Sequence, residues 1–494
     1  MSSVHTLTDH EFGLIRGMVA HRPSLTNQAI LAYISRPGRD INHRVIGAIR
    51  GGWTRPGVRV ASAADVNGFM AAIERLWRYS PMFLSGPLSL CRRRLLLDWW
   101  PVGQGLFASG AIAGGPGAPL NWVYDCGTSS RDTLLVSALD AFQSRQDSIS
   151  ATSIRLCVVS HFDRDHISGI VRLLDRFPVR TLLLPYVPLW RRLLIALEQG
   201  VGADDEFFDF FINPASWLAA RSGRGIGEII FVPSSGLDGP LPAAPEEGGG
   251  DLDDRELDLK PEEGGPPQDA AGDPVLEQPV TGPQVRFLRP GGRLIAPLVW
   301  EFVPYNDAAL APKVPRIFSS AAAPLIGQLR DDRSKRALAL KALKALYDRE
   351  FGSSAKARNL ISLFLYSGPL GSQMALGGGW GAGPPPGAVD FSQIHTGDGT
   401  LDEGVRYDAF ERFYGAGRRL ERTQIFQVMH HGAKGNSHAG VAAKIAPDVS
   451  IFSSNPGDGR YNHPHAEVLR DFWPWGAKQV DCEQGYALER GLMI

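Results

Sequence analysis

The sequence predicts an α/β fold preceded by a small helical unit. From about Leu95 onward, short apolar runs end in glycine-rich turns and alternate with amphipathic segments, which is typical of strands joined by helices. Before that point, residues 8–77 follow a helical pattern. The chain has 494 residues, of which 44% are hydrophobic, enough for a large core and two or three structural units. We therefore expect a helical module over residues 1–85 and an α/β domain over residues 90–494.

The expected module consists of several short helices. Thr8 is placed to cap the first helix, and Pro37-Gly38 separates the second helix from a third over residues 42–50. Two short helices joined by a tight turn resemble a helix-turn-helix unit that binds DNA. A plain helical cap with solvated arginines is the alternative interpretation. The arginines near the expected turn are Arg36, Arg39, Arg44 and Arg50.

In the α/β segment, each expected strand is a short apolar run that ends at glycine, proline or a polar turn. The expected helices carry apolar residues at helical spacing between charged ones. The strands are expected at residues 95–97, 122–124, 155–159, 179–185, 300–303, 360–366, 424–429 and 449–453, and the helices at 131–142, 167–177 and 331–351.

The near-neutral charge of the chain hides two unlike parts. The whole sequence has 51 basic and 52 acidic residues, but 13 acidic and only two basic residues fall between Leu237 and Val280. The remainder has a net charge of +10, which is compatible with nucleic-acid binding. Residues 234–283 are rich in glycine, proline and acidic residues, so we expect a disordered insertion there. One hypothesis is that this insertion covers the binding groove as a DNA mimic.

Cysteine usage and hydropathy restrict the class of protein further. The four cysteines show no paired spacing, so a disulfide framework and a zinc ribbon are not expected. The N-terminus lacks the pattern of a signal peptide, and no run of about 20 apolar residues occurs. We expect a cytoplasmic protein without a membrane partner. The cysteines are Cys91, Cys126, Cys157 and Cys482.

One short segment carries most of the chemical information. His161, Asp163, Asp165 and His166 follow the apolar strand expected at residues 155–159. A loop between a strand and a helix is where α/β folds place ligand chemistry. Residues 161 and 163 can face one side of this loop, and residues 165 and 166 the other. Four imidazole or carboxylate groups within six residues therefore predict a site for two adjacent metal ions.

The H-x-D-x-D-H segment resembles the signature of the metallo-β-lactamase fold, and its aspartate variant resembles the hydrolase domain of ComEC DNA-uptake proteins. Six further matches follow the family's order, and together they are highly specific. The resemblance implies a four-layer αββα sandwich. It covers only the hydrolase, because the membrane channel of ComEC is missing. The further matches are Val102-Gly-Gln-Gly105 with Asp125-Cys-Gly127, Asn359-Leu-Ile-Ser362, Thr396-Gly-Asp398, His430 to Ser437, and Tyr461-Asn-His-Pro-His465.

The resemblance also implies roles for single residues. We expect only one histidine of the His430-His431 pair to face a metal and choose His431, which leaves His430 to contact a substrate phosphate. Lys434 is a candidate to neutralise that phosphate, and a solvated lysine is the alternative. The implied ligands are His161, Asp163 and His431 for one metal, Asp165, His166 and His463 for the other, and Asp398 as the bridge; His395, His438 and His465 are candidates to support them.

A mixed carboxylate and imidazole site predicts two divalent ions, Zn²⁺ or Mn²⁺. The first functional hypothesis is a dinuclear metal-dependent phosphodiesterase, a DNA nuclease that uses a hydroxide held between the metals, with Asp165 contacting both metal and hydroxide. DNA would bind through the N-terminal module and a basic groove. The alternatives are a hydrolase of a cyclic nucleotide, small phosphoester or lactone, and a DNA-bound regulator with a structural metal site.

Overall fold

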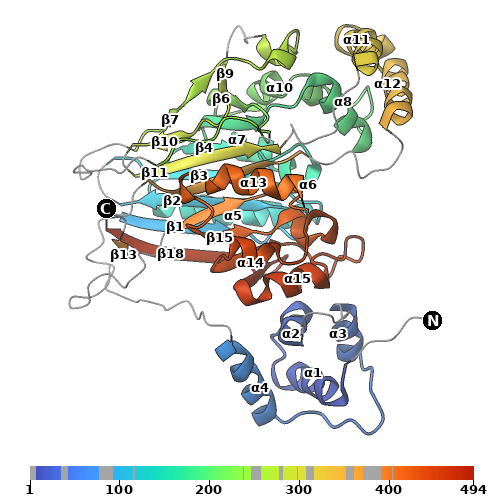
Figure 1. Cartoon of the computed structure of the whole chain (residues 1–494), viewed down its shortest axis with the longest axis vertical. Coiled ribbons are helices and arrows are strands. Elements are labelled where there is room, and N and C mark those ends of the chain that lie inside the picture. The colour runs from blue at the N-terminus through green and yellow to red at the C-terminus, as the bar shows by residue number, and fades with distance from the viewer. Residues whose placement is uncertain are drawn as a thin grey trace.

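The computed structural model has a mixed α/β architecture in which two mixed β-sheets pack face to face (Figure 1). The α/β fold class expected from the sequence is confirmed at this level. No helix within the described ranges is both long and apolar enough to cross a membrane. The structure describes residues 7–34, 43–76, 93–114, 117–236, 238–245, 257–277, 282–297, 299–307, 316–351, 361–370, 375–376, 391–402 and 404–493.

The first sheet has ten strands in the order β13-β18-β1-β2-β3-β4-β5-β6-β9-β8. Its strands from β3 to β9 run parallel, which aligns their carboxyl ends at one edge. The strands are β1 (Arg93–Trp99), β2 (Phe107–Ala113), β3 (Leu120–Cys126), β4 (Ile154–Val158), β5 (Val179–Pro185), β6 (Ile226–Val232), β8 (Glu263–Gly264), β9 (Gln284–Leu288), β13 (Ala375–Leu376) and β18 (Tyr486–Met493).

The second sheet has eight strands in the order β17-β16-β15-β14-β12-β11-β10-β7. Its last four strands in sequence, β14 to β17, are also parallel. The strands are β7 (Lys260–Pro261), β10 (Leu294–Ala296), β11 (Trp300–Asn306), β12 (Leu363–Pro369), β14 (Ser392–His395), β15 (Thr423–Gln427), β16 (Val449–Ser453) and β17 (Ala477–Val480).

A continuous apolar core joins the two sheets. Leu95 and Leu97 of β1 face this core, because alternate side chains of a strand point to the same side. Trp122 of β3 and Trp300 of β11 meet across it with ring centroids 5.6 Å apart. Close to the candidate site the sheets also touch through hydrogen bonds, since the Leu363 N–H donates to the carbonyl of Ser160 at 2.8 Å. The relative position of the two sheets is therefore fixed next to the loop from His161 to His166.

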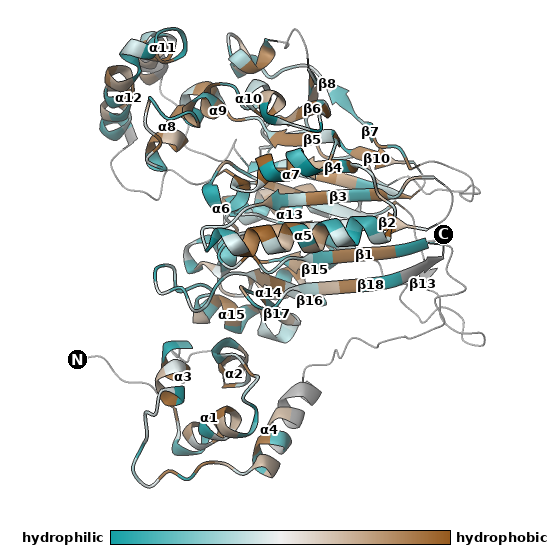
Figure 2. Cartoon of the chain, turned by 180° about the vertical axis from the view of Figure 1, so that it is seen from behind, coloured by the Kyte–Doolittle hydropathy of each residue, from teal (hydrophilic) through white to brown (hydrophobic). Residues whose placement is uncertain are grey.

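Helices cover the outer face of each sheet. On the first sheet, α5 places Leu135, Leu139 and Phe142 toward the strands, and its ribbon alternates between brown and teal in Figure 2. The helices on this side include α5 (Asp132–Ser148), α7 (Ile170–Arg176), α8 (Leu189–Glu198), α9 (Phe208–Ile212), α10 (Pro214–Arg221), α11 (Arg316–Asp331) and α12 (Arg336–Phe351), and those on the other side include α13 (Val405–Gly415), α14 (Val441–Ile445) and α15 (Ala466–Phe472).

The chain begins with four helices, of which the second and third lie next to α15 (Figure 1). Thr8 caps the first of them in a capping box with Glu11, as its place in the sequence predicts. The ring of Tyr33 contacts that of Trp473 at 6.4 Å, beyond the end of α15. The expected break at Pro37-Gly38 lies outside the described residues, together with Arg36 and Arg39. The helices are α1 (Asp9–His21), α2 (Asn27–Ile34), α3 (His43–Arg50) and α4 (Ala63–Leu76).

The arginines of the expected helix-turn-helix unit that fall within the described residues have intramolecular partners. Arg44 donates to the carbonyl of Gly459 and to the side chain of Asn462, in the loop that precedes His463. Arg50 donates to Asn27 Oδ1 at 2.8 Å, which ties α3 to α2. Arg44 and Arg50 therefore link parts of this protein to one another, which accounts for part of the positive charge of the module.

The expected disorder of residues 234–283 is corrected by the structure for residues 257–277. In this segment β7 pairs with β10 and β8 pairs with β9, so it completes the edge of each sheet. Leu257, Ala270 and Val275 are buried. Asp273 forms a buried ion pair with Arg192 of α8, with Oδ1 2.8 Å from Nη2. Composition underestimated the order because a few buried residues anchor an otherwise polar segment.

Candidate metal centre

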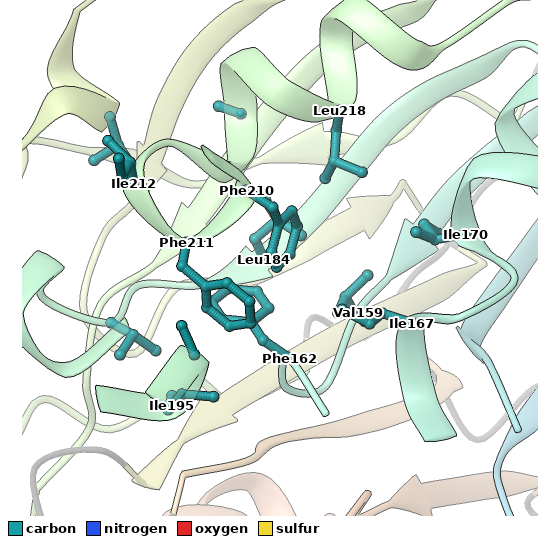
Figure 3. Packing of buried hydrophobic residues seen from close by; sticks show 14 of the residues in the cluster. Val159, Phe162, Ile167, Ile170, Leu184, Ile195, Phe210, Phe211, Ile212 and Leu218 are labelled. Atoms are coloured by element: carbon teal, nitrogen blue, oxygen red, sulfur yellow. The ribbon is translucent and has the colours of Figure 1, made fainter. Parts of the chain in front are cut away.

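The candidate site lies where the carboxyl ends of parallel strands from both sheets meet. His161 to His166 follow β4, Asp398 follows β14, and the His430-His431 pair follows β15. Phe162 anchors the first of these loops, because its ring is buried against Phe210 at 5.2 Å in the cluster shown in Figure 3. The loop is therefore held by the apolar core while its polar side chains point away from that core.

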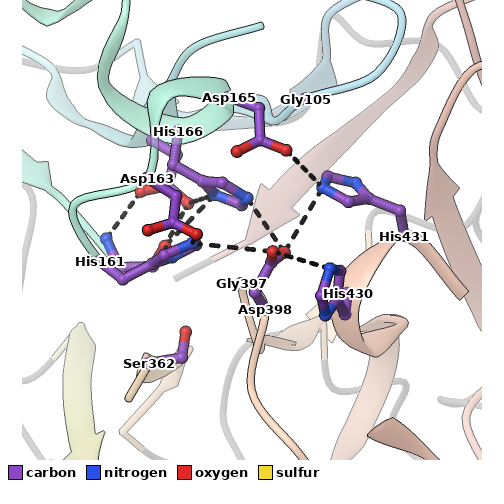
Figure 4. Close-up of polar contacts among 12 residues, drawn as sticks. Gly105, His161, Asp163, Asp165, His166, Ser362, Gly397, Asp398, His430 and His431 are labelled. Carbon is purple, nitrogen blue, oxygen red and sulfur yellow. Dashed lines mark hydrogen bonds and ion pairs between the residues drawn. The ribbon is translucent and has the colours of Figure 1, made fainter. Parts of the chain in front are cut away.

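Asp398 is at the centre of the site (Figure 4). Its Oδ1 lies 3.0 Å from Nε2 of His166 and 3.4 Å from Nε2 of His431. Its Oδ2 lies 3.3 Å from Nε2 of His430 and 3.7 Å from Nε2 of His161. Each oxygen of one carboxylate thus faces two imidazoles, the arrangement that a bridging ligand requires.

The donor atoms form two groups that share Asp398. One group is Asp165, His166, Asp398 and His431, and the other is His161, Asp163 and Asp398; within each group the donor atoms lie within 4.8 Å of one another. The pairing of residues within the H-x-D-x-D-H loop agrees with the expected division, with residues 161 and 163 on one side and 165 and 166 on the other. His431 differs from the expectation, because it joins Asp165 and His166 instead of His161 and Asp163.

Both histidines of the pair face the centre, whereas we expected only one to do so. His430 has φ 44° and His431 has φ 58°, so both residues adopt the left-handed conformation. This backbone turns two successive side chains toward Asp398 instead of placing them on opposite sides. His430 lies on the side of His161 and Asp163, because both its Nε2 and that of His161 approach Oδ2 of Asp398.

Hydrogen bonds at Nδ1 orient His161 and His166. His166 Nδ1 donates to Asp125 Oδ2 at 2.7 Å, since a carboxylate can only accept. Ser160 Oγ donates to the same carboxylate at 2.6 Å and so accepts from Nδ1 of His161 at 2.8 Å. In both rings Nε2 is left free to bind a cation at the centre.

His430 and His431 are oriented in the same way. His430 Nδ1 donates to Asn436 Oδ1 at 3.1 Å, and the amide nitrogen of Asn436 donates to the carbonyl of Asp398 at 3.1 Å. His431 Nδ1 donates to the carbonyl of Ser453. Four imidazoles therefore present Nε2 toward one carboxylate, with each Nδ1 proton held by a separate acceptor.

Buried carboxylates and imidazoles shift one another's pKa values at this site: against the effect of burial, His430, His166 and His431 hold the pKa of Asp398 well below its ordinary value. Burial, together with the carboxylates of Asp165 and Asp398, raises the pKa of Asp163 to about 7. Burial and the neighbouring His166 lower the pKa of His161 to about 4. Nε2 of His161 is buried without a hydrogen-bond partner, and the buried Nε2 of His166 and Oδ1 of Asp398 lie 3.0 Å apart. Buried nitrogen and oxygen donors that converge on the same space fit divalent cations.

His463 lies outside both groups. Gln104 accepts from the Asn455 N–H through Oε1, so its Nε2 donates to Nδ1 of His463 at 3.4 Å. In the neutral imidazole the proton is therefore on Nε2. In this tautomer Nε2 donates a hydrogen bond and does not bind a metal. Burial lowers the pKa of His463 to about 3, so the ring is neutral. Its centroid is 5.6 Å from that of His430.

The other candidate residues lie outside the two donor groups and contact other parts of the protein. Lys434 is exposed, and its backbone N–H donates to Nδ1 of His465. His395 is buried against the ring of Tyr124 at 4.5 Å, on the inter-sheet side. His438 bonds the carbonyl of Leu401 at 2.9 Å. None of these three histidines belongs to the two donor groups found in the described ranges.

Asp125 and Ser160 support the ligands and Gln104 supports His463, and sequence reasoning assigned these three residues no role. Asp125 and Gln104 were visible only as parts of the D-x-G and G-Q-G turns. Asp125 is fully buried and accepts from the Ser160 N–H at 2.7 Å. A buried aspartate at the end of a central strand was the available signal, because such a carboxylate requires a partner.

Gly397 lets Asp398 enter the centre. Its φ is 53°, and a Cβ there would lie 2.5 Å from Ser362 Oγ and 2.7 Å from Ser160 Oγ. Any side chain at this position would push Asp398 away from the metal loop.

We predict that Asp125→Asn weakens divalent metal binding about 10- to 100-fold, the usual effect of losing a carboxylate that orients a ligand histidine. The asparagine keeps the shape but cannot accept from Ser160 and His166 with a full negative charge. Titration calorimetry with Mn²⁺ measures the change. Asp132→Asn, on the exposed first turn of α5, is the matched control and should bind Mn²⁺ like the wild type. Equal affinities for Asp125→Asn and the control would contradict the prediction.

The fold and the site together define a mixed α/β protein with a candidate dinuclear metal centre. No protein-family model and no curated protein matches this sequence. The functional interpretation therefore rests on the motifs and on the geometry described above.

Proposed function

We propose that this protein is a dinuclear metal-dependent phosphodiesterase of the metallo-β-lactamase type and that it cleaves DNA. The observation that carries the proposal is the position of Asp398, which belongs to both donor groups. Two facing sheets with helices on their outer faces support the expected αββα layering. The order of the motifs along the chain and their convergence at the carboxyl ends of the strands support the family assignment.

The donor set divides naturally between two ions. His161 and Asp163 would hold one ion, with His430 on the same side, and Asp165, His166 and His431 would hold the other. Asp398 would contact both. When bound, two adjacent divalent cations stabilise the extra negative charge of a phosphodiester transition state and lower the pKa of a coordinated water. Carboxylate and imidazole ligands are compatible with both Zn²⁺ and Mn²⁺.

The remaining polar groups are placed to handle substrate. His463 carries an N–H donor beside the donor groups, and Lys434 is exposed near it through His465. Both can contact phosphate oxygens without competing for a cation. The basic balance outside residues 237–280 and the four N-terminal helices beside the His463 loop favour a polyanionic substrate.

The test is to measure bound metal by elemental analysis and then to add single- or double-stranded DNA with Mn²⁺ or Zn²⁺. We expect two ions per chain and release of shorter fragments, and no cleavage by Asp165→Ala or Asp398→Ala. Two bound ions without DNA cleavage would overturn the nuclease assignment and direct the search to small phosphodiesters. Absence of bound metal would overturn the site itself.

A further inference from the structure

A cavity of about 350 Å³, lined by both polar and apolar residues, lies on the far side of Gln104 from His463. Its volume is within the range of small-ligand sites. The loop that leads from β3 into α5 forms one wall, and the loop after β16 forms the other. The residues that matter for its chemistry are Ser129, Ser130, Arg131, Asn455, Asp458 and Arg460.

Gln104 lies between this cavity and His463. Its backbone N–H donates to Ser130 Oγ at 2.9 Å on the cavity wall, and its Oε1 accepts from the Asn455 N–H at 3.3 Å on the opposite wall. Its Nε2 reaches Nδ1 of His463. A molecule that spans the cavity and the centre therefore passes over one buried side chain.

The cavity has the charge needed for an anion. The guanidinium of Arg131 is exposed and has no hydrogen-bond or ion-pair partner among the described residues. Arg460 is bound by Asp458, with Nη2 2.6 Å from Oδ2. Two guanidinium groups and one carboxylate leave a net positive charge, and arginine is the side chain best suited to phosphate.

Tyr461, which follows Arg460 of the cavity wall in the chain, adds a flat surface next to that arginine. Its side chain remains 39% exposed, which is unusual for a large ring. Its ring lies under the guanidinium of Arg460 at 5.3 Å and 6.1 Å from the ring of His463. An exposed aromatic ring next to arginines is the combination that binds unpaired nucleic-acid bases.

We propose that this cavity binds the nucleotide adjacent to the cleaved bond of a single strand, with Arg131 and Arg460 on its phosphate and Tyr461 stacked on its base. A stacked base must be unpaired, so the substrate is single-stranded where it enters the site. This inference rests on the proposed function and specifies its substrate class.

The arginine test measures binding of a fluorescently labelled oligothymidylate by anisotropy, in EDTA so that no hydrolysis occurs. Arg131→Gln should weaken binding about tenfold, the size of a lost charge-assisted hydrogen bond. It should also reduce the slope of log affinity against log salt by about 0.7. The matched control is Arg180→Gln, an exposed arginine of β5, which should bind within about twofold of the wild type.

The tyrosine test separates stacking from packing. Tyr461→Leu should weaken oligothymidylate binding about tenfold or more, since one stacked base is lost. Tyr461→Phe keeps the ring and should restore affinity to near that of the wild type. Equal losses for both variants would overturn the stacking role.

Unchanged oligothymidylate binding in both Arg131→Gln and Tyr461→Leu would overturn the proposal. Loss of thymidine monophosphate binding without loss of oligothymidylate binding would overturn it in favour of a free nucleotide ligand.

Hydrolysis is measured separately with a p-nitrophenyl ester of thymidine monophosphate, which has no neighbouring phosphate. For Arg131→Gln, the ratio of oligonucleotide to ester kcat/KM should fall about tenfold. A wild type that binds through the cavity but cleaves neither substrate contradicts the phosphodiesterase proposal alone.

Discussion

Asp398→Asn should prevent the binding of two metal ions and lower the kcat/KM of metal-dependent hydrolysis by at least about 1,000-fold. Asp398 is the one residue that belongs to both donor groups. An asparagine offers a single neutral oxygen, so it cannot bridge two cations. The N–H of its amide would also donate to a histidine Nε2 and so occupy the lone pair that a cation needs.

Two measurements check this prediction. Elemental analysis should find fewer than two ions in Asp398→Asn. Thermal unfolding should lose the metal-induced stabilisation, which is about 2.7 kcal/mol when the metal is present at about 100 times Kd. Asp402→Asn, an exposed aspartate in the same loop, controls for the loss of a charge and should retain both properties. Retention of two ions by Asp398→Asn would show that it does not bridge them.

Asp273→Ala should lower the free energy of unfolding by about 3–5 kcal/mol, the usual cost of leaving one member of a buried ion pair alone. Asp273 accepts from both terminal nitrogens of Arg192, at 3.0 and 2.8 Å, and from the Val275 N–H at 3.1 Å. Arg192 is only 1% exposed, so water cannot replace the lost carboxylate. Removal of the carboxylate should also release residues 257–277 from the sheet edges.

Denaturant unfolding gives the free energy, and limited proteolysis reports the release of residues 257–277. Asp269→Ala, an exposed neighbour in the same segment, should change stability by less than about 0.5 kcal/mol. If Asp273→Ala unfolds like this control and resists protease, the ion pair does not hold the segment in place.

Local pattern predicted eight of the eighteen strands within the described residues, together with the N-terminal helices and α5, α7 and α12. The expected strands at residues 179–185 and 449–453 coincide with β5 and β16. Strands of this kind are buried on both faces, so a short apolar run between turn residues identifies them. The edge strands β7 and β8 were missed because they have two residues each and are mostly polar, and their pairing depends on neighbours distant in sequence.

The sequence by itself determined the donor chemistry. Four ligand-type residues within His161 to His166 lie in one loop, and their spacing already divides them into two pairs. The tertiary structure alone decided which distant residues complete each pair. It placed His431 with Asp165, turned His430 toward Asp398, and left His463 outside both groups.

The physical reason is the range of the interactions involved. Spacing within one loop is limited by covalent geometry, so it can be read from the sequence. The positions of Asp398 and the His430-His431 pair depend on the packing of two sheets, on the left-handed backbone of the pair and on the bonds of its rings to Asn436 and Ser453. The packing of the sheets involves residues far apart in the chain, and only the folded structure brings them together.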